Sequence, residues 1–254
     1  MSQLRPQTTR STDFLTQSLP KVFEPASFLN ISRAVHFPVT IQPPFPSPTA
    51  TWHNESYAAI DPSNPNLSQI GKTVIITGAG SGIGRATALA FAEASAAQLV
   101  LTERTESSLR ETEKLLGDSK SDCMVFPVSA TDETAMQNVA EQVDAWDVLV
   151  LAVAQISSPS SSGQDWWADY EMTVKAIVIA SRAFVPNAKS DAALYTLAAG
   201  AAALQSAYTP GRSAYFTSKV AQTKIVEFLA AENPDLLACE SWNGGYRYLP
   251  RQWY

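Results

Sequence analysis

An apolar, strand-like run that opens directly into closely spaced glycines is the feature that most constrains the fold of this chain. The run from Thr73 to Ile76 is β-branched, the stretch Thr77 to Gly84 reads TGAGSGIG, and an alanine-rich helical pattern follows. Glycines in such a turn let the backbone approach a phosphate, which the N–H groups and dipole at a helix start attract. The context favours a dinucleotide turn over a merely structural one. Its predicted contacts are Gly78, Ser81, Gly82, Ile83 and Gly84.

The pattern after this turn predicts an α/β fold. Short β-branched runs alternate with helical stretches, which is typical of βαβ units around a parallel sheet buried on both faces. Right-handed crossovers then predict a Rossmann-type, doubly wound parallel sheet with helices on both faces. The predicted strands are 73–76, 98–101, 124–128, 148–153, 193–197 and, more weakly, 236–239. The predicted helices are 83–93, 106–116, 133–144, 166–184 and 213–232.

The chain of 254 residues divides into three predicted segments. Residues 1–70 are rich in Pro, Ser and Thr and lack a sustained period, so we expect an irregular N-terminal extension. Residues 71–240 carry the alternating pattern and form the predicted NAD(P)-binding Rossmann domain. Residues 241–254 are aromatic and basic without an element pattern, and we expect an atypical C-terminal tail.

Composition argues against several classes of partner. The formal charge of -6 gives no electrostatic footprint for nucleic acid or anionic lipid, and no apolar run reaches membrane-spanning length. We therefore expect a cytoplasmic protein with neither partner. Cys123 and Cys239 form no disulfide framework, and His36 and His53 stand apart from other ligand types, so no metal is expected.

Two charged residues after the second predicted strand bear on the choice of cofactor. Glu103 follows Gly84 by nineteen positions, where a carboxylate can accept both ribose hydroxyls of NAD. Arg104 comes next, and its guanidinium can pair with the 2′-phosphate of NADP. Either residue could instead be a solvated charge at a strand end. The sequence therefore predicts NAD or NADP without choosing between them.

A tyrosine and a lysine four residues apart stand on the last predicted helix. Tyr215 and Lys219 lie on one helical face, one turn apart. A nearby ammonium lowers the pKa of a phenol, which prepares it for proton exchange with a hydroxyl or carbonyl. Such pairs also occur by chance on helix surfaces, but downstream of a dinucleotide turn the catalytic interpretation is favoured.

Together the turn TGAGSGIG and the stretch Pro210 to Lys219, which reads PGRSAYFTSK, resemble the short-chain dehydrogenase/reductase family. The resemblance covers residues 70–238, and the segment from Pro46 to Thr73 resembles the filamentous-fungal branch. It implies that Tyr215 is the acid/base and that Lys219 holds the nicotinamide ribose and tunes Tyr215. It also implies a homodimer or homotetramer, with residues 166–184 and 213–232 paired across a two-fold axis.

Several positions depart from the family pattern near the expected chemistry. Ala199 stands where the family has a serine that orients the substrate carbonyl, and Ser206 is the alternative donor. Ala152 stands in the turn that is usually Asn-Ala-Gly. Thr173 replaces an asparagine that supports a relay water, and a threonine hydroxyl can still bind water. Ser129 replaces an aspartate near the adenine, where its hydroxyl can accept the same N–H.

The end of the chain also departs from the family. The run from Glu240 to Gly245 reads ESWNGG in place of a Pro-Gly turn, so the last strand and the substrate loop are expected to be missing. A truncated product and a chain that has given up catalysis both fit this pattern.

Two functions therefore stay open. The first is an NAD(P)-dependent oxidoreductase that acts on a small-molecule carbonyl or alcohol, with a role in fungal secondary metabolism. The second is a catalytically impaired NAD(P)-binding protein, and an unstable remnant is a third, less favoured hypothesis.

Overall fold

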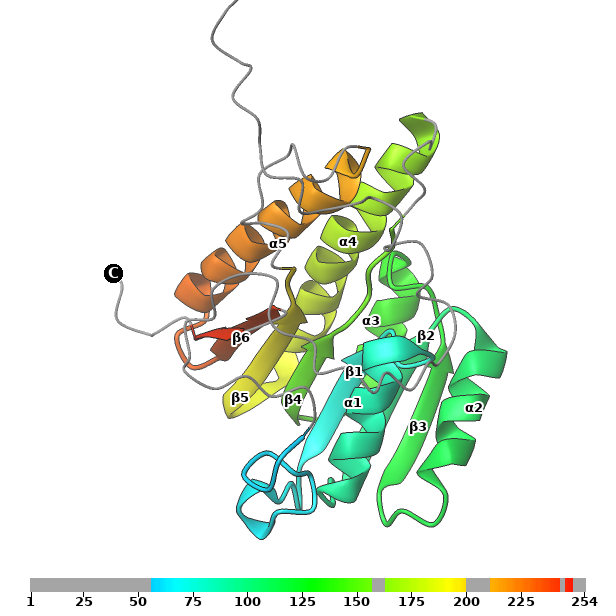
Figure 1. The fold of residues 1–254 in the computed structure, drawn as a ribbon, viewed down its shortest axis with the longest axis vertical. Helices are drawn as coiled ribbons and strands as arrows, with labels where there is room; N and C mark the ends of the chain where they lie inside the picture. Colours follow the sequence, from blue (N-terminus) through cyan, green and yellow to red (C-terminus); the bar gives the residue numbers. More distant parts are fainter. Residues whose placement is uncertain (1–55, 157–162, 200–210, 243–244, 249–254) are drawn as a thin grey trace, which may run out of the picture. The chain divides into compact units, whose positions relative to one another are not determined.

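The computed structural model describes residues 56–156, 163–199, 211–242 and 245–248, which form a single sheet flanked by helices (Figure 1). The strand order is β3-β2-β1-β4-β5-β6-β7. The strands are β1 (Thr73–Thr77), β2 (Gln98–Glu103), β3 (Asp122–Pro127), β4 (Trp146–Leu151), β5 (Ala188–Leu197), β6 (Leu237–Trp242) and β7 (Gly245–Tyr248). The helices are α1 (Gly82–Glu93), α2 (Glu106–Leu116), α3 (Glu133–Gln142), α4 (Gly163–Phe184) and α5 (Ser213–Glu232).

Strands β1 to β6 pair in parallel, and the predicted Rossmann-type α/β fold is confirmed. Alternate residues of each central strand point to opposite faces of the sheet. Val74 and Ile76 pack with apolar side chains of α1 and α2, whereas Ile75 packs with those of α3, α4 and α5. Because both faces are covered, the central strands read as continuous apolar runs rather than as an alternating pattern.

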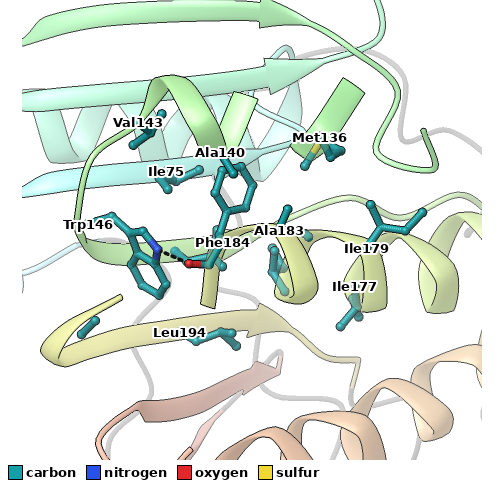
Figure 2. Close-up of a cluster of buried hydrophobic side chains, with 14 of the residues drawn as sticks. Ile75, Met136, Ala140, Val143, Trp146, Ile177, Ile179, Ala183, Phe184 and Leu194 are labelled. Carbon is teal, nitrogen blue, oxygen red and sulfur yellow. Dashed lines mark hydrogen bonds between the residues drawn. The ribbon is translucent and has the colours of Figure 1, made fainter. Parts of the chain in front are cut away.

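The larger core cluster lies between the sheet and helices α3, α4 and α5 (Figure 2). Trp146 at the start of β4 is fully buried, and its indole Nε1 donates a hydrogen bond to the carbonyl oxygen of Phe184 at 2.7 Å. This bond satisfies the polar atom of a buried ring and fixes the end of α4 against the sheet.

A charged cluster links the amino-terminal ends of strands β1, β4 and β5, at the end of the sheet opposite the glycine turn. The Asp147 carboxylate accepts from the backbone N–H of Thr73 at 2.9 Å, from Lys72 Nζ at 2.9 Å and from Lys189 Nζ at 2.6 Å. Burial raises the pKa of this carboxyl, but the bonds from Lys189, Thr73 and Lys72 outweigh burial and hold the pKa below its usual range.

The C-terminal end corrects the sequence analysis. Residues 241–254 were expected to lack an element, but β6 extends to Trp242 and β7 follows it. The expectation that the family's last strand and substrate loop are missing stays a prediction, because β7 is an antiparallel addition to the sheet. The two strands pair antiparallel, with Cys239 opposite Tyr248 and Trp242 opposite Gly245. The two residues between the strands lie outside the described part, and a two-residue connection is enough to join adjacent antiparallel strands. The Asn-Gly pair at 243–244 is the sequence signal that could have predicted this strand pairing.

Several other boundaries differ by a few residues from the predicted ones, and the largest shift is at β5, which begins at Ala188 rather than at residue 193. Strand β4 ends at Leu151 rather than Val153, and the Ala152 N–H makes one more bond to the Thr77 carbonyl oxygen before the chain turns away. Within the expected N-terminal extension, residues 56–70 contain turns and the short 3-10 helix η2 (Pro65–Leu67), whereas residues 1–55 lie outside the described part.

Candidate functional site

The predicted site residues gather where the parallel strands end. The glycine turn follows β1, Glu103 ends β2, Ser129 follows β3 and Leu197 ends β5. Carboxyl ends of parallel strands meet at one edge of a sheet, and ligands of open α/β sheets bind there. The change in direction of the strand order falls between β1 and β4, beside the glycine turn.

The glycine turn is held closely to its neighbours. The N–H of Gly78 donates to the Thr102 carbonyl oxygen at 2.8 Å. Gly78 has a φ of +72°, and a Cβ there would lie 3.1 Å from the carbonyl carbon of Ala152. A Cβ on Gly84 would lie 2.1 Å from the Gly78 carbonyl oxygen. Both positions thus require glycine, because a side chain would displace backbone.

Gly82 differs from the other two glycines. It has a φ of +52°, and nothing lies within 4 Å of where its Cβ would be, so the space in front of α1 is open. Ser81 precedes α1 in an extended conformation and makes no side-chain cap to it. Exposed Ser81, Gly82 and Ile83 therefore present the helix start and its donors to this open space.

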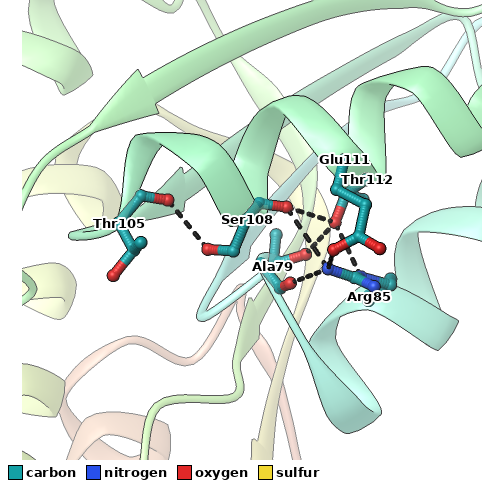
Figure 3. A network of polar contacts seen from close by, with 7 residues as sticks. Ala79, Arg85, Thr105, Ser108, Glu111 and Thr112 are labelled. Carbon is teal, nitrogen blue, oxygen red and sulfur yellow. Dashed lines mark hydrogen bonds and ion pairs between the residues drawn. The ribbon is translucent and has the colours of Figure 1, made fainter.

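Arg85 fastens this turn to α2 (Figure 3). Its guanidinium donates to the Gly80 carbonyl oxygen, to Thr112 Oγ1 at 3.0 Å and to the Glu111 carboxylate at 2.7 Å. The buried Thr112 hydroxyl in turn donates to the Ala79 carbonyl oxygen at 2.9 Å. Two carbonyls of the turn are thus fixed by side chains of two helices. We call these contacts the Arg85 clasp.

Glu103 and Arg104 adjoin the turn with different exposure. Glu103 is half-buried, and its Cγ would lie 2.7 Å from a Cβ on Gly80. Its carboxylate accepts from the Arg104 N–H at 2.9 Å, and the Arg104 side chain is exposed. Ser129 starts the turn before α3, where its hydroxyl lies 3.0 Å from Thr131 Oγ1. All three residues lie at the same sheet edge as the turn.

Tyr215 and Lys219 lie in the first turns of α5, as expected. The Lys219 Nζ is 5.9 Å from the centroid of the Tyr215 ring. Lys219 is buried and donates to the Leu197 carbonyl oxygen at 2.6 Å and to Gln222 Oε1 at 2.9 Å. The lysine thus bridges α5 and the end of β5.

The pKa of Tyr215 differs from the sequence expectation. A neighbouring ammonium was expected to lower it, but burial raises the pKa of Tyr215 in this structure. The Lys219 ammonium donates hydrogen bonds to the Leu197 carbonyl oxygen and to Gln222 Oε1, and it lies next to the phenol ring. These two acceptors determine where the ammonium points. Burial lowers the pKa of Lys219 to about 8, although the charge of Glu240 raises it.

The departures near the chemistry have distinct surroundings. Ala199 follows β5 and is half-buried, while Ser206, the alternative donor, lies outside the described residues. Thr173 is fully buried on α4, and its Oγ1 has no hydrogen-bond partner among the described residues. Such a hydroxyl suits a buried water molecule.

Aromatic side chains at the start of α4 face the start of α5. Trp166 stacks on Tyr170 with ring centroids 5.4 Å apart, and Trp167 meets Trp166 edge-on at 5.0 Å. The Trp166 Nε1 donates to Ser213 Oγ at 2.8 Å. Because Ser213 precedes Tyr215 by two residues, this contact joins the aromatic group to the helix that carries the tyrosine.

The sequence analysis missed three residues that organise the site. Arg85 looked like an ordinary helix residue, although its place one residue after the last glycine was a usable signal. Gln222 stands one turn after Lys219, and a polar residue on an inward helical face was its signal. Glu240 was noted only as the start of an unfamiliar run, because the predicted strand ended at residue 239, one position before it.

The described residues contain neither a metal-binding cluster nor a membrane-spanning helix. No group of three or more His, Cys, Asp or Glu side chains is placed to hold a metal ion there, and His36 and His53 lie outside that part. None of the described helices is long and apolar enough to cross a membrane.

Comparisons with known proteins agree with this geometry. Residues 72–235 match the model of the short chain dehydrogenase family. A curated relative, short chain dehydrogenase mpl6 of Monascus purpureus, is 28% identical over 209 residues, which cover 74% of this chain and 69% of the relative.

Solved structures show the same fold. A short chain dehydrogenase structure from Pseudomonas syringae matches with a TM-score of 0.65 at 23% identity, covering 71% of this chain and 78% of that one. A structure from Escherichia coli CFT073 in complex with NADPH matches with a TM-score of 0.61 at 18% identity, covering 70% and 80%. The chain belongs to the short-chain dehydrogenase/reductase family of oxidoreductases and resembles its fungal members.

Proposed function

We propose that this protein is an NAD(P)-dependent oxidoreductase that transfers hydride between nicotinamide and a carbonyl or secondary alcohol, with Tyr215 as the general acid/base. The observation that carries the proposal is the arrangement at one sheet edge. An open glycine turn follows β1, and a Tyr-Lys pair is fastened to the end of β5 through the Lys219 bond to Leu197.

The residues at the turn fit a dinucleotide. The open space at Gly82 leaves room for a pyrophosphate, and the start of α1 offers backbone donors without a competing side-chain cap. Glu103 supports NAD through the ribose hydroxyls, and exposed Arg104 supports NADP through a 2′-phosphate. The NADPH complex of the Escherichia coli structure supports nicotinamide nucleotides as a class. The choice between the two is left to measurement.

The chain's own groups would supply the proton chemistry. Bound nicotinamide would donate or accept the hydride. Tyr215 would donate a proton to the carbonyl oxygen during reduction and accept it during oxidation. A charged Lys219, one turn away, would favour the phenolate form electrostatically and so oppose the effect of burial on Tyr215. Among the described residues, Leu197 and Gln222 accept from two of the three N–H donors of Lys219, and the third would donate to a ribose hydroxyl.

A second function is favoured by specific observations. Ala199 offers no hydroxyl after β5, and burial raises the pKa of Tyr215. Losing one oriented donor costs on the order of 10²–10³ in rate. These features favour a catalytically impaired NAD(P)-binding protein, which would bind the nucleotide without turnover.

We propose that two copies of the chain associate through the outer faces of α4 and α5. Trp167 is 65% exposed on α4, and Val220 and Phe228 are 51% and 57% exposed on α5. Exposed apolar side chains on neighbouring helices suit a two-fold interface, as in a homodimer or homotetramer. Light scattering at micromolar concentration tests this, and a monodisperse monomer would reject it.

The proposed partner is a small-molecule carbonyl or alcohol. We also propose a cytoplasmic location and a role in fungal secondary metabolism, the latter supported by the fungal relatives.

The experiment that tests the function measures binding and turnover side by side. NADH and NADPH fluorescence titrations report binding, and oxidation of either nucleotide over a panel of ketones and aldehydes reports turnover. Turnover that is lost in Tyr215→Phe supports the enzyme. Tight binding without turnover over the whole panel selects the impaired protein, and absence of binding rejects both.

A further inference from the structure

The Lys219 ammonium sits in a pocket of polar groups inside the core. The residue is 2% exposed, and its Nζ donates to the Leu197 carbonyl oxygen at 2.6 Å and to Gln222 Oε1 at 2.9 Å. A buried ammonium needs acceptors and counter-charge, because water no longer solvates it. The identity of these groups therefore decides where the ammonium points and whether it stays charged.

Gln222 is placed to direct this ammonium. It follows Lys219 by three residues on α5, so the two side chains lie on one helical face. Gln222 is 1% exposed, and its Nε2 has no hydrogen-bond partner among the described residues. A buried amide with an unsatisfied donor is unfavourable in a core position. The hydrogen bond that Gln222 Oε1 accepts from Lys219 explains why a glutamine, and not an apolar residue, stands at this buried position.

Glu240 supplies a charge to the same place from the sheet. It is 2% exposed on β6 and pairs in register with Thr196 on β5, the residue before Leu197. Cross-strand partners share a face of the sheet, and Leu194 and Ala238 show that this is the face packed on α4 and α5. The carboxylate thus lies on the Lys219 side of the sheet, one strand from the carbonyl that the lysine binds.

We propose that Gln222 and Glu240 are positioning residues for Lys219. Gln222 fixes the direction of the ammonium by accepting its hydrogen bond, and Glu240 provides the buried counter-charge that keeps the lysine ionised. Their functional meaning rests on the proposed function, in which the charged lysine faces the ribose and tunes Tyr215. Neither residue touches the reacting atoms in this assignment.

The electrostatics agree with this arrangement. Burial lowers the pKa of Lys219 to about 8, and the charge of Glu240 acts in the opposite direction. The charge of Glu240 on β6 acts on this ammonium, the centroid of the Tyr215 ring on α5 lies 5.9 Å from it, and β5 contributes the Leu197 carbonyl oxygen. With a pKa near neutral pH, a modest change at either positioning residue shifts the charged fraction of the lysine.

The test measures the titration of Lys219 directly, without nucleotide or substrate. Protein labelled with ¹³C at the lysine ε-carbon is titrated by NMR, and Lys219→Met identifies the resonance. Gln222→Leu and Glu240→Gln should each lower the pKa of Lys219, by about one unit when a buried partner of the charged form is lost. Gln222→Glu should raise it, because this variant keeps an acceptor and adds a negative charge.

The pKa of Lys219 is expected to fall in Gln222→Leu and to rise in Gln222→Glu. Such opposite shifts distinguish a positioning role of Gln222 from a role in packing alone, which would not produce them. Ser218→Ala is the matched control. Ser218 is also buried on α5, but its hydroxyl donates to the Tyr215 carbonyl oxygen rather than to Lys219. The control should leave the lysine titration unchanged. Circular dichroism shows which variants fold. If Gln222→Leu does not fold, the near-isosteric variants Glu240→Gln and Gln222→Glu still test the inference.

Two failures are distinguishable. An unchanged Lys219 titration in folded Gln222→Leu, Gln222→Glu and Glu240→Gln overturns this inference, even if the wild-type protein binds and oxidises NADPH. Conversely, the expected shifts in a protein that binds neither nucleotide would retain the positioning of Lys219 and reject the proposed function.

Discussion

The ammonium of Lys219 donates a hydrogen bond to the carbonyl oxygen of Leu197, and this single 2.6 Å contact joins helix α5 to the end of strand β5. Leu197 precedes the segment in which Ala199 stands, so the lysine is fastened to the same strand end that would orient a substrate carbonyl. The glycine turn lies two strands away, after β1, with β4 between them. A nicotinamide nucleotide that starts at the turn would therefore have to cross the end of β4 to reach Lys219.

The first prediction concerns the Arg85 clasp. Arg85→Met should remove the contacts to Gly80 and Thr112 while keeping an apolar stem of similar length. We expect NADPH affinity to fall roughly tenfold, because the turn must then be ordered on binding. Glu111→Gln is the control, since Glu111 is 61% exposed and such a pair contributes little. Fluorescence titration measures both, and equal loss in the control would contradict the assigned role of the clasp.

The second prediction separates two glycines of the turn. Gly84→Ala would bring a Cβ to 2.1 Å from the Gly78 carbonyl oxygen, so we expect a loss of about 1–3 kcal/mol or more in stability. Gly82→Val meets no atom within 4 Å, and its strain comes from a φ of +52°. It should cost about 1–2 kcal/mol in folding yet abolish nucleotide binding, because the side chain fills the open space. Thermal melting and NADPH titration distinguish the two; unchanged NADPH affinity in Gly82→Val would reject the assigned turn.

The fold was largely predictable because its signals are local. Apolar runs predict β1, β2 and β5, and helical periods predict α2 and α5. Each of these patterns reflects the burial of one element, so it can be recognised from the residues of that element alone. The contacts of the site are not local. Arg85 reaches α2 across twenty-three to twenty-seven positions, and Glu240 on β6 acts on Lys219 on α5. The partners of these residues therefore cannot be identified from the sequence around them. The raised pKa of Tyr215 likewise follows from its burial in the folded chain, which the local sequence does not specify.

The third prediction follows from the lowered pKa of Asp147. Its carboxyl ionises more readily when folded than in the unfolded chain, where the value is about 3.9. The resulting stability is therefore fully present above that unfolded value and is lost as the pH falls through the lower, folded value. Asp147→Asn should cost about 1–3 kcal/mol at pH 7, and the gap to wild type should close below about pH 4.

Urea unfolding from pH 7 to pH 3 measures this gap. Glu171→Gln is the control, because its ion pair with Lys175 is exposed on both sides. A gap that stays constant with pH would show that the ionised Asp147 carboxylate does not carry the stability.

The fourth prediction concerns the choice of nucleotide. Glu103→Ala should shift preference toward NADP, because a carboxylate beside the turn repels a 2′-phosphate while Arg104 remains to bind it. Arg104→Ala should shift preference the other way. The ratio of NADH to NADPH dissociation constants is the measurement, and a ratio that moves in neither variant would place both residues away from the ribose.

The last prediction asks whether the site has lost a donor or replaced it. If Ala199 is a true loss, Ala199→Ser should raise ketone reduction roughly 10²-fold, the size expected for one oriented hydroxyl near a developing oxyanion. Ala198→Ser is the matched control, because it adds the same hydroxyl one residue earlier, and NADPH affinity should change in neither. If Ser206 already fills the role, Ala199→Ser would change little and Ser206→Ala would cost the same factor. Turnover in any of these variants should disappear with Tyr215→Phe. Tight NADPH binding with no turnover in wild type, Ala199→Ser or Ser206→Ala would show that the missing hydroxyl does not limit the reaction, and the cofactor-binding function would then replace the enzymatic one.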